Sequence, residues 1–135
     1  DLYGQPTLLM HGDTLCTDDS GYMEFRRRVR DNGWQRTFLK KPLEERRRMS
    51  MAVRDSSRIQ TRGKPEYIMD VNQEAVIQTM MKHRVQRLIH GHTHRPAIHD
   101  LMVAGKPAQR MVLGAWYTQG SVLECTAEGC QLQTL

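Results

Sequence analysis

The sequence has no apolar run near the roughly 18 residues of a membrane span, although 39% of its 135 residues are hydrophobic. Its opening, DLYGQPTLLMHG, lacks the basic start and the long apolar stretch of an export signal. An initiator methionine is also missing, and an apolar segment follows within a few residues. We therefore expect a piece of a longer protein, without an export signal or a membrane span of its own.

Cysteine is scarce. Cys16, Cys125 and Cys130 are an odd number, and no CxxC pair occurs, which argues against a zinc ribbon and against a disulfide framework. Cys125 and Cys130 flank TAEG, a sequence that suits a hairpin turn, and they could face each other. We nevertheless predict free thiols, as is usual in a reducing cytosol.

Acidic residues are few in one long segment. Residues 26–64 contain 14 lysines and arginines against 4 acids, a net charge of +10, whereas the whole chain carries +5. The rest of the chain is therefore acidic. A basic block inside an acidic frame predicts an anionic partner, such as phosphate groups, nucleic acid or a lipid surface.

Internal repeats and low-complexity segments are absent, and local patterns predict an α/β fold. A short apolar run over 6–12 predicts a buried strand. The segment 17–31 then predicts a helix that Thr17, Asp18 or Asp19 can cap.

The second half alternates helix and strand in the same way. A helix is predicted over 68–84 with Asp70 as its cap, and a strand follows at once over 85–92. After a connection over 93–109, three strands joined by tight turns are expected to complete the chain as a β meander.

Residues 32–64 mix apolar side chains with dense arginine and lysine. Asn32 and Gly33 are expected to end the preceding helix, and Pro42 to divide this segment into two short helices. A polar, flexible stretch is expected to follow over 55–65. We interpret 32–64 as a helical lid insertion over a site, within a single domain that covers 1–135.

Histidine is concentrated at two expected strand ends. His90, His92 and His94 would project to one side of a continuous strand, although Gly91 allows a bend. His11 also ends a strand, and the carboxyl ends of strands in open α/β sheets form sites, so these imidazoles are candidates to bind a transition metal. A histidine before a glycine is also a common hydrogen-bonded turn residue. Two histidines without such a context are expected on the surface: His83 and His99.

Four segments carry a resemblance to a known family: LLMHGDTLCTDD, IMDVNQEAV, LIHGHTHRPAIH and VLGAW. GHTHRP with an upstream MHGD resembles the C-terminal half of the calcineurin-like metallophosphoesterases. The longer segments are similar, more narrowly, to the UDP-2,3-diacylglucosamine hydrolases of lipid A biosynthesis, along nearly the whole chain. The resemblance implies the C-terminal portion of a four-layer αββα sandwich with a helical lid.

In that family two metal ions, usually Mn²⁺, share Asp, His and Asn ligands. The resemblance implies His11, His92 and His94 as metal ligands here and leaves His90 outside the set. The metal ions would activate a water that attacks a phosphorus of the diphosphate, and would neutralise charge on the phosphoryl oxygens. The products would be UMP and 2,3-diacylglucosamine 1-phosphate.

The family's substrate contacts correspond to five residues of this chain: Asp19, Ser57, Thr61, Lys64 and His92. Their chemistry suits the substrate, because a carboxylate can accept from amide or hydroxyl groups of an amino sugar and hydroxyls can bond its oxygens. Lysine offers a compact cation for phosphate. Without the resemblance, the same residues from 57 to 64 would be interpreted as a solvated polar loop.

The resemblance also gives the lid a purpose. Its apolar residues could line an acyl-chain groove, dip into a membrane surface, or simply pack the lid against the body; they are Trp34, Phe38, Leu39 and Leu43. Arginines at 26–28 and 46–48 could hold anionic lipid headgroups at ~1 kcal/mol for each residue near the surface. We expect a peripheral protein on the cytoplasmic face of the bacterial inner membrane, with no nucleic-acid partner.

The motifs that supply the family's other metal ligands, Asp-x-His, a further Gly-Asp and Gly-Asn-Arg/His, do not occur in this sequence. The resemblance therefore implies the function of a longer parent, and this chain alone is expected to be inactive. Two other functions stay open. One is a soluble metallophosphoesterase acting on nucleotides, which would not need apolar lid residues, and the other is a nucleic-acid-binding module, which would bind any duplex in a salt-dependent manner.

Overall fold

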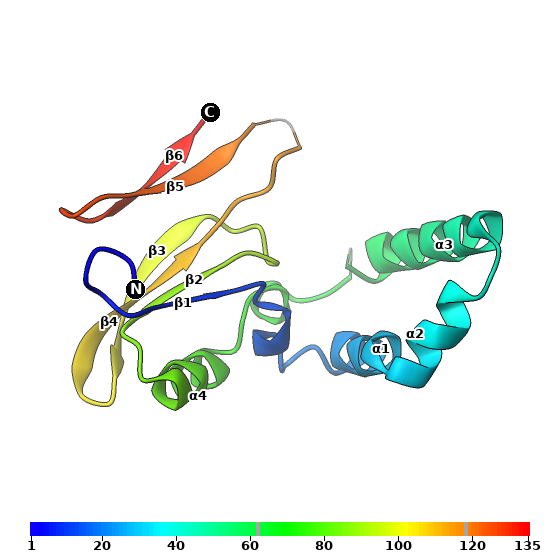
Figure 1. Ribbon diagram of the computed structural model, residues 1–135, viewed down its shortest axis with the longest axis horizontal. Coiled ribbons are helices and arrows are strands. Elements are labelled where there is room, and N and C mark those ends of the chain that lie inside the picture. The colour runs from blue at the N-terminus through cyan, green and yellow to red at the C-terminus, as the bar shows by residue number, and fades with distance from the viewer. Residues whose placement is uncertain (62, 118) are drawn as a thin grey trace. The chain divides into compact units, whose positions relative to one another are not determined.

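The computed structural model describes every residue except Arg62 and Thr118, and the side chains of residues 58–61, 66 and 67 also lie outside the described part (Figure 1). The chain divides into two compact units, one formed by 1–17 with 70–135 and the other by 18–69. We call them the sheet unit and the helical unit. The expected α/β class is confirmed, because the chain combines a mixed β-sheet with helices.

The sheet unit begins with strand β1 and ends with a β-hairpin. Its elements are β1 (Thr7–Met10), the short 3-10 helix η1 (Asp13–Leu15), α4 (Gln73–His83), β2 (Arg87–His90), β3 (Ala97–Val103), β4 (Lys106–Val112), β5 (Ser121–Cys125) and β6 (Cys130–Thr134). The main sheet has the order β1-β2-β4-β3, with β1, β2 and β4 parallel and β3 antiparallel to β4. Met10 pairs with His90 in the register of β1 and β2. The two strands therefore end at the same level, and the residues that follow them meet at one edge of the sheet.

The core of the sheet unit lies between α4 and one face of this sheet. Val76 and Met80, one helical turn apart on α4, pack in one cluster with Leu88 of β2 and Ala108 of β4, and all of them are buried. Full burial of a side chain such as Met80 contributes about 1.5–3 kcal/mol relative to an exposed one. This contact fixes α4 against β2, the strand that leads into the histidine motif.

Helix α4 begins later than expected, because Asn72 and not Asp70 is its N-cap. The Asn72 side chain accepts a hydrogen bond from Ala75 N at 2.9 Å. Asp70 accepts instead from Val71 N at 2.7 Å and from Arg110 Nη1 at 3.3 Å. Both residues are good capping types. The buried guanidinium of Arg110 requires an acceptor. Asp70 supplies it and does not cap α4.

The C-terminal part contains two hairpins, so the expected three-strand meander is wrong. Residues 97–103, which we expected to connect, form β3, and β3 turns into β4 through Ala104 and Gly105, both with positive φ. β3 lies at the sheet edge and alternates more and less exposed side chains, which weakens its apolar signal in the sequence. His99, expected on the surface, is partly buried on this strand.

The prediction that Cys125 and Cys130 are free thiols is wrong, because the two residues form a disulfide. They lie directly opposite each other in the register of β5 and β6, where the TAEG turn closes the hairpin as expected. Cys16 lies elsewhere and is buried. The pairing follows from the hairpin register, which the number and spacing of the cysteines do not reveal.

The helical unit contains α1 (Ser20–Arg30), α2 (Asn32–Leu39), α3 (Leu43–Thr61) and the short 3-10 helix η2 (Glu66–Met69). An aspartate caps each of the first two helices. Asp19 accepts from Tyr22 N at 3.0 Å, which confirms one of the three expected caps, and Asp31 accepts from Trp34 N at 2.8 Å. Such a cap is typically worth about 1 kcal/mol to the helix it begins.

The boundaries of these helices correct two expectations. Because Asp31 already caps a new helix, Asn32 and Gly33 begin α2 and do not merely end α1. Pro42 separates α2 from α3, as expected. The stretch expected to be flexible over 55–65 is helical as far as Thr61, within α3. The interpreted insertion, 32–64, lies inside the helical unit, which also includes residues 18–31.

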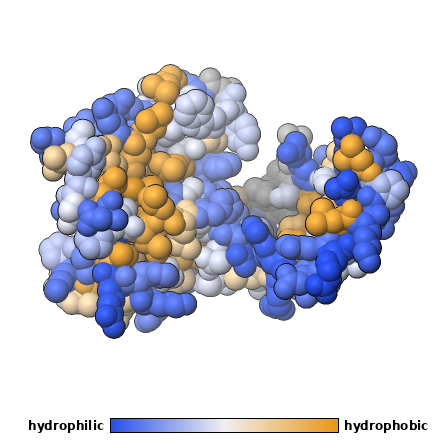
Figure 2. Space-filling view, viewed as in Figure 1, coloured by the Kyte–Doolittle hydropathy of each residue, from blue (hydrophilic) through white to orange (hydrophobic). Residues whose placement is uncertain are grey.

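Basic and apolar side chains lie close together on the surface of the helical unit. Trp34 and Phe38 stack with ring centroids 5.0 Å apart, and Leu39 and Leu43 are more than half exposed. Figure 2 shows a mostly hydrophilic surface over this unit, with small hydrophobic groups between the polar ones. Among the helices that the structure describes, none combines the length and the apolar composition needed to cross a bilayer.

Candidate functional site

Strands β1 and β2 each bring one histidine to the same edge of the sheet. His11 follows β1 directly, and His92 follows β2 after Gly91. The ring centroids of His11 and His92 are 4.8 Å apart, with the rings inclined at 62°. Gly91 N donates a hydrogen bond to the carbonyl oxygen of His11 at 3.1 Å, which ties the two loops together just beyond the strands.

Asp13 orients the ring of His11. Its Oδ1 lies 3.1 Å from His11 Nδ1, and the carboxylate is buried, whereas 62% of the His11 side chain is exposed. Gly12 permits this turn because its φ of +100° lies in the region that favours glycine. When Nδ1–H is donated to a carboxylate, Nε2 keeps its lone pair for a metal or a proton. In the sequence Asp13 stood out only as part of the His11 motif, and this role was not predicted.

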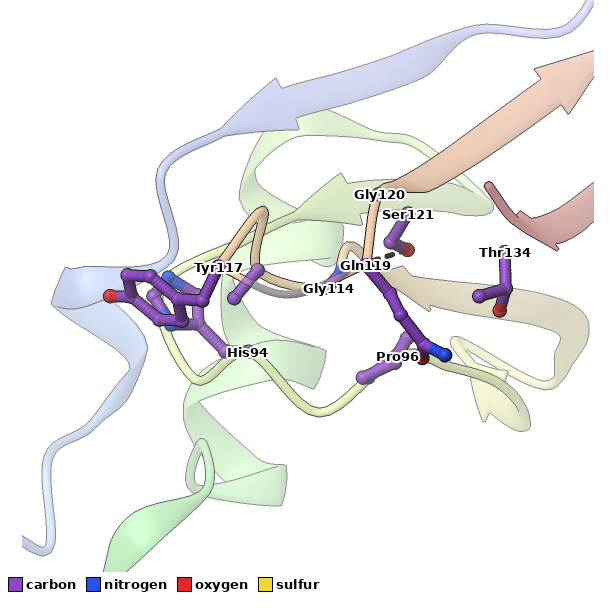
Figure 3. Close-up of a pocket in the computed structure, with 9 residues that line it drawn as sticks. His94, Pro96, Gly114, Tyr117, Gln119, Gly120, Ser121 and Thr134 are labelled. Carbon is purple, nitrogen blue, oxygen red and sulfur yellow. Dashed lines mark hydrogen bonds between the residues drawn. The ribbon is translucent and has the colours of Figure 1, made fainter.

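The loop after β2 turns sharply. β2 ends at His90, as the adjacent glycine led us to expect, and His92 and His94 then have φ values of +68° and +53°. Such values are uncommon outside glycine. As a result the ring of His94 lies against Tyr117, with centroids 5.8 Å apart (Figure 3). The structure thus brings two of the three predicted ligands together, His11 and His92, and places His94 beside a tyrosine.

A shallow hollow of about 210 Å³ adjoins His94 (Figure 3). His94 and Pro96 line it from the histidine loop, Tyr117 lines it from the segment before β5, and Ser121 is the first residue of β5. Ser121 Oγ accepts a hydrogen bond from Gly114 N at 3.2 Å and closes one side. The described residues that line it include no carboxylate, so they offer a polar, largely neutral surface and no acidic metal ligand.

His90 lies beneath these loops in a buried polar network that sequence reasoning missed. Its Nδ1 is 2.9 Å from the carbonyl oxygen of Gly91, and its Nε2 is 3.3 Å from Arg110 Nη1. Burial lowers the pKa of His90, and the neighbouring Arg110 guanidinium lowers it further, so the ring is neutral at pH 7. Arg110 also donates to Asp70. The only sequence signal was an arginine at the start of the apolar run RMVLGAW.

The expected substrate-binding residues outside the histidine motif belong to the helical unit. Lys64 Nζ donates to Asp19 Oδ2 at 2.5 Å, so two of them form one ion pair. Partial burial raises the pKa of Asp19, but the hydrogen bonds from Lys64 and from Tyr22 N outweigh burial and hold this pKa below its ordinary value. Ser57 is exposed on α3. The side chain of Thr61 lies outside the described residues.

The histidine pair fits part of a metal centre. An imidazole nitrogen holds a divalent ion at about 2.0–2.1 Å, so one ion can be shared by rings whose centroids are 4.8 Å apart. Within the described residues, however, no three His, Cys, Asp or Glu side chains converge closely enough to hold a metal ion. His11 and His92 are therefore two suitable donors, with the buried Asp13 carboxylate behind the first, and a complete metal site would need further ligands.

The chain is similar to known proteins that share one description. No family model matches the chain. The chain is 52% identical over 132 residues to UDP-2,3-diacylglucosamine hydrolases of Enterobacter sp. (strain 638) and of Salmonella arizonae, and 51% identical to that of Klebsiella pneumoniae. Each match covers 98% of this chain and 55% of the relative, so the chain spans about half the length of the curated relatives it matches. From its first strand to its last, this chain is thus similar to one continuous half of the UDP-2,3-diacylglucosamine hydrolases.

Proposed function

We propose that this chain is part of an enzyme that hydrolyses the diphosphate bond of UDP-2,3-diacylglucosamine in lipid A biosynthesis, giving UMP and 2,3-diacylglucosamine 1-phosphate. The observation that carries the proposal is the His11–His92 pair at one sheet edge, in a chain 52% identical to hydrolases named for this substrate. The proposal concerns the whole protein, and we expect this chain alone to be inactive.

In this proposal His11, His92 and His94 are ligands in a centre for two Mn²⁺ ions. His11 enters with Nε2 directed outward, because Asp13 occupies Nδ1. His94, whose side chain is exposed, would have to turn from Tyr117 toward the pair. When bound, such ions supply a water nucleophile near neutral pH and neutralise charge on phosphoryl oxygens. We propose that His92 also contacts the substrate phosphates.

The helical unit is proposed to hold the rest of the substrate. The Asp19–Lys64 pair presents an acceptor and a cation side by side, which suits the amide and the phosphate of an acylated amino-sugar phosphate. Ser57 is exposed on α3 and can donate to substrate oxygens. Thr61 is one helical turn further along the same helix and is proposed to act with it.

The surface of the helical unit supports a lipid partner and a peripheral location on the cytoplasmic face of the bacterial inner membrane. The Trp34–Phe38 stack and the exposed Leu39 and Leu43 offer apolar area to acyl chains. Exposed arginines on α1 and α3 offer charge to anionic headgroups. A soluble nucleotide substrate would not need the apolar residues, and we expect no nucleic-acid partner.

The architecture of the whole protein is proposed to be a four-layer αββα sandwich. In the described part of the chain, β1 pairs only with β2 and has a further edge available for pairing. Leu9 of β1 is 69% exposed on the face opposite the α4 core. A second half that adds strands beside β1 and covers Leu9 would complete both the sandwich and the ligand set.

The test is hydrolysis of UDP-2,3-diacylglucosamine by the full-length protein. We expect activity that requires Mn²⁺ and falls by at least about 100-fold in His92→Ala, because that residue is assigned both metal and phosphate contacts. His83→Ala is the matched control, since His83 is exposed at the end of α4, and it should keep full activity. Unchanged turnover in His92→Ala would contradict the proposal. Equal turnover of UDP-sugars without acyl chains would favour a soluble nucleotide phosphoesterase.

A further inference from the structure

His90 touches both loops that carry the paired histidines. It is the last residue of β2 and only 1% exposed. A Cβ atom on Gly12 would lie 2.7 Å from His90 Nδ1, so the backbone next to His11 rests directly against this ring. His92 follows two residues later. The buried ring of His90 therefore contacts the loop that carries His11. The loop that carries His92 begins directly after His90.

The hydrogen bonds of His90 define a single tautomer. The carbonyl oxygen of Gly91 can only accept, so Nδ1 carries a proton and donates it at 2.9 Å. A guanidinium can only donate, so Nε2 accepts from Arg110 Nη1 at 3.3 Å. Both nitrogens are thus engaged, and neither is available to a metal ion. The two bonds on opposite sides of the ring fix its orientation.

The hydrogen bonds of His90 are connected, through Gly91, to the hydrogen bond that joins the two histidine loops. The carbonyl oxygen of Gly91 accepts the His90 hydrogen bond, and the Gly91 amide, which belongs to the preceding peptide group, donates to the His11 carbonyl oxygen at 3.1 Å. On the other side Arg110, 4% exposed, is held by Asp70 Oδ1 at 3.3 Å. His92, with its φ of +68°, has a backbone conformation that persists only where its surroundings enforce it.

We propose that His90, oriented by Arg110, is a positioning residue that sets the separation between the rings of His11 and His92. The proposal deepens the proposed function, because the pair is useful to the reaction only if it holds a divalent cation. The separation itself is a property of the metal-free protein. It can therefore be tested without metal and without activity.

The direct test is nuclear Overhauser contact between the rings of His11 and His92 in the full-length, metal-free protein with labelled histidine. Wild type should show the contact, since the centroids are 4.8 Å apart. His90→Phe retains a buried ring but loses both hydrogen bonds, and the contact should disappear while the circular dichroism spectrum stays native. His90→Gln, whose side-chain oxygen can still accept from Arg110, should restore part of it. Persistence of the full contact in a folded His90→Phe protein would overturn the proposal.

Two further variants separate positioning from general stability. Arg110→Met removes the donor to Nε2 while keeping an unbranched side chain about as long as the aliphatic part of arginine, and should weaken the same ring contact; it decides the question if His90→Phe does not fold. His99→Phe makes the same chemical change on β3, opposite Arg110 in the sheet register. This control should leave the His11–His92 contact intact. Loss of the contact in His99→Phe to the same degree would also count against the proposal.

Binding of Mn²⁺, measured by the electron paramagnetic resonance of the free ion, distinguishes the proposed function from the positioning role of His90. Outer-shell groups typically change metal affinity by about 10- to 100-fold, and we expect a loss of this size in His90→Phe. Wild-type protein that binds no Mn²⁺ would contradict the proposed function, whereas the ring contact would still decide the positioning role. Wild-type affinity in a folded His90→Phe protein would contradict the positioning role alone.

Discussion

Asp19 shows how one side chain can serve two purposes at the level of a single residue. One carboxylate oxygen caps α1 by accepting from Tyr22 N, and the other pairs with Lys64. The sequence predicted the first role from the residue type and the second only as a substrate contact. The ion pair could not be predicted, because Lys64 is 45 residues away and reaches Asp19 only after α3 has formed.

The Asp19–Lys64 pair predicts a specific pH dependence of stability. The folded-state pKa of Asp19 is below the ordinary value of 3.8, so its contribution is complete above that value and is lost as the pH falls through the lower, folded-state pKa. Asp19→Asn keeps a capping oxygen but loses the charge. We expect it to lower the free energy of unfolding by about 0.5–1 kcal/mol at pH 7, and by nothing measurable near pH 2.

Urea unfolding of both proteins at several pH values measures this difference. Glu24→Gln provides the control, because Glu24 is exposed on α1 and does not cap this helix. A difference between wild type and Asp19→Asn that is the same at pH 2 and at pH 7 would show that charge is not the cause.

At the level of elements, Asn72 determines where α4 begins. Replacing it by alanine removes the oxygen that accepts from Ala75 N, and we expect unfolding to become easier by about 1 kcal/mol. Asn72→Asp should recover most of this loss, since aspartate caps equally well. Thermal or urea unfolding tests the pair of variants. An alanine variant as stable as wild type would mean that α4 is held by its buried face alone.

The elements also show which parts of the fold were accessible from the sequence. β1, β2 and α4 were predicted because buried apolar residues mark them, as at Leu88 and Met80. β3 was missed because an edge strand exposes alternate residues such as Ile98 and Met102. The cap of α4 and the disulfide were missed for a different reason. Each depends on a partner chosen by the fold, Arg110 in one case and the hairpin register in the other.

The candidate site, like the fold, was predictable only in part. Two histidines following parallel strands had to meet at one edge once the register was set, and His11 and His92 do. The direction of the His94 side chain depends on positive φ values in its loop. The residue types in THRP do not predict such values. Arg110 and Asp70 are 40 residues apart in the chain, so their bond to one another and to His90 appears only in three dimensions.

At the level of the whole molecule, the charge of the helical unit predicts binding to anionic vesicles. Arg46, Arg47 and Arg48 lie on α3, and Arg47 also pairs with Glu44 at 2.7 Å. Changing all three to serine should reduce cosedimentation of the full-length protein by at least about 10-fold, at ~1 kcal/mol for each charge near the surface. Vesicles of purely neutral lipid should bind neither protein.

A matched control keeps the net charge equal. Lys82, Arg84 and Lys106 are all exposed on the sheet unit, and the triple serine variant of these residues loses the same three charges. It should cosediment like wild type. Equal losses in both triple variants would attribute binding to total charge and not to the helical unit.

Leu15 and Asn72 belong to the sheet unit and lie just before and just after the helical unit in the chain. The Asn72 amide donates to the Leu15 carbonyl at 2.8 Å, and this bond fastens the chain where it leaves η1 to the chain where it enters α4. Residues 16–71 are therefore an insertion whose two ends are held together by this hydrogen bond. That segment can therefore be lengthened, shortened or exchanged, and with it the lipid contacts proposed for the helical unit, while the strand ends that present His11 and His92 stay in place.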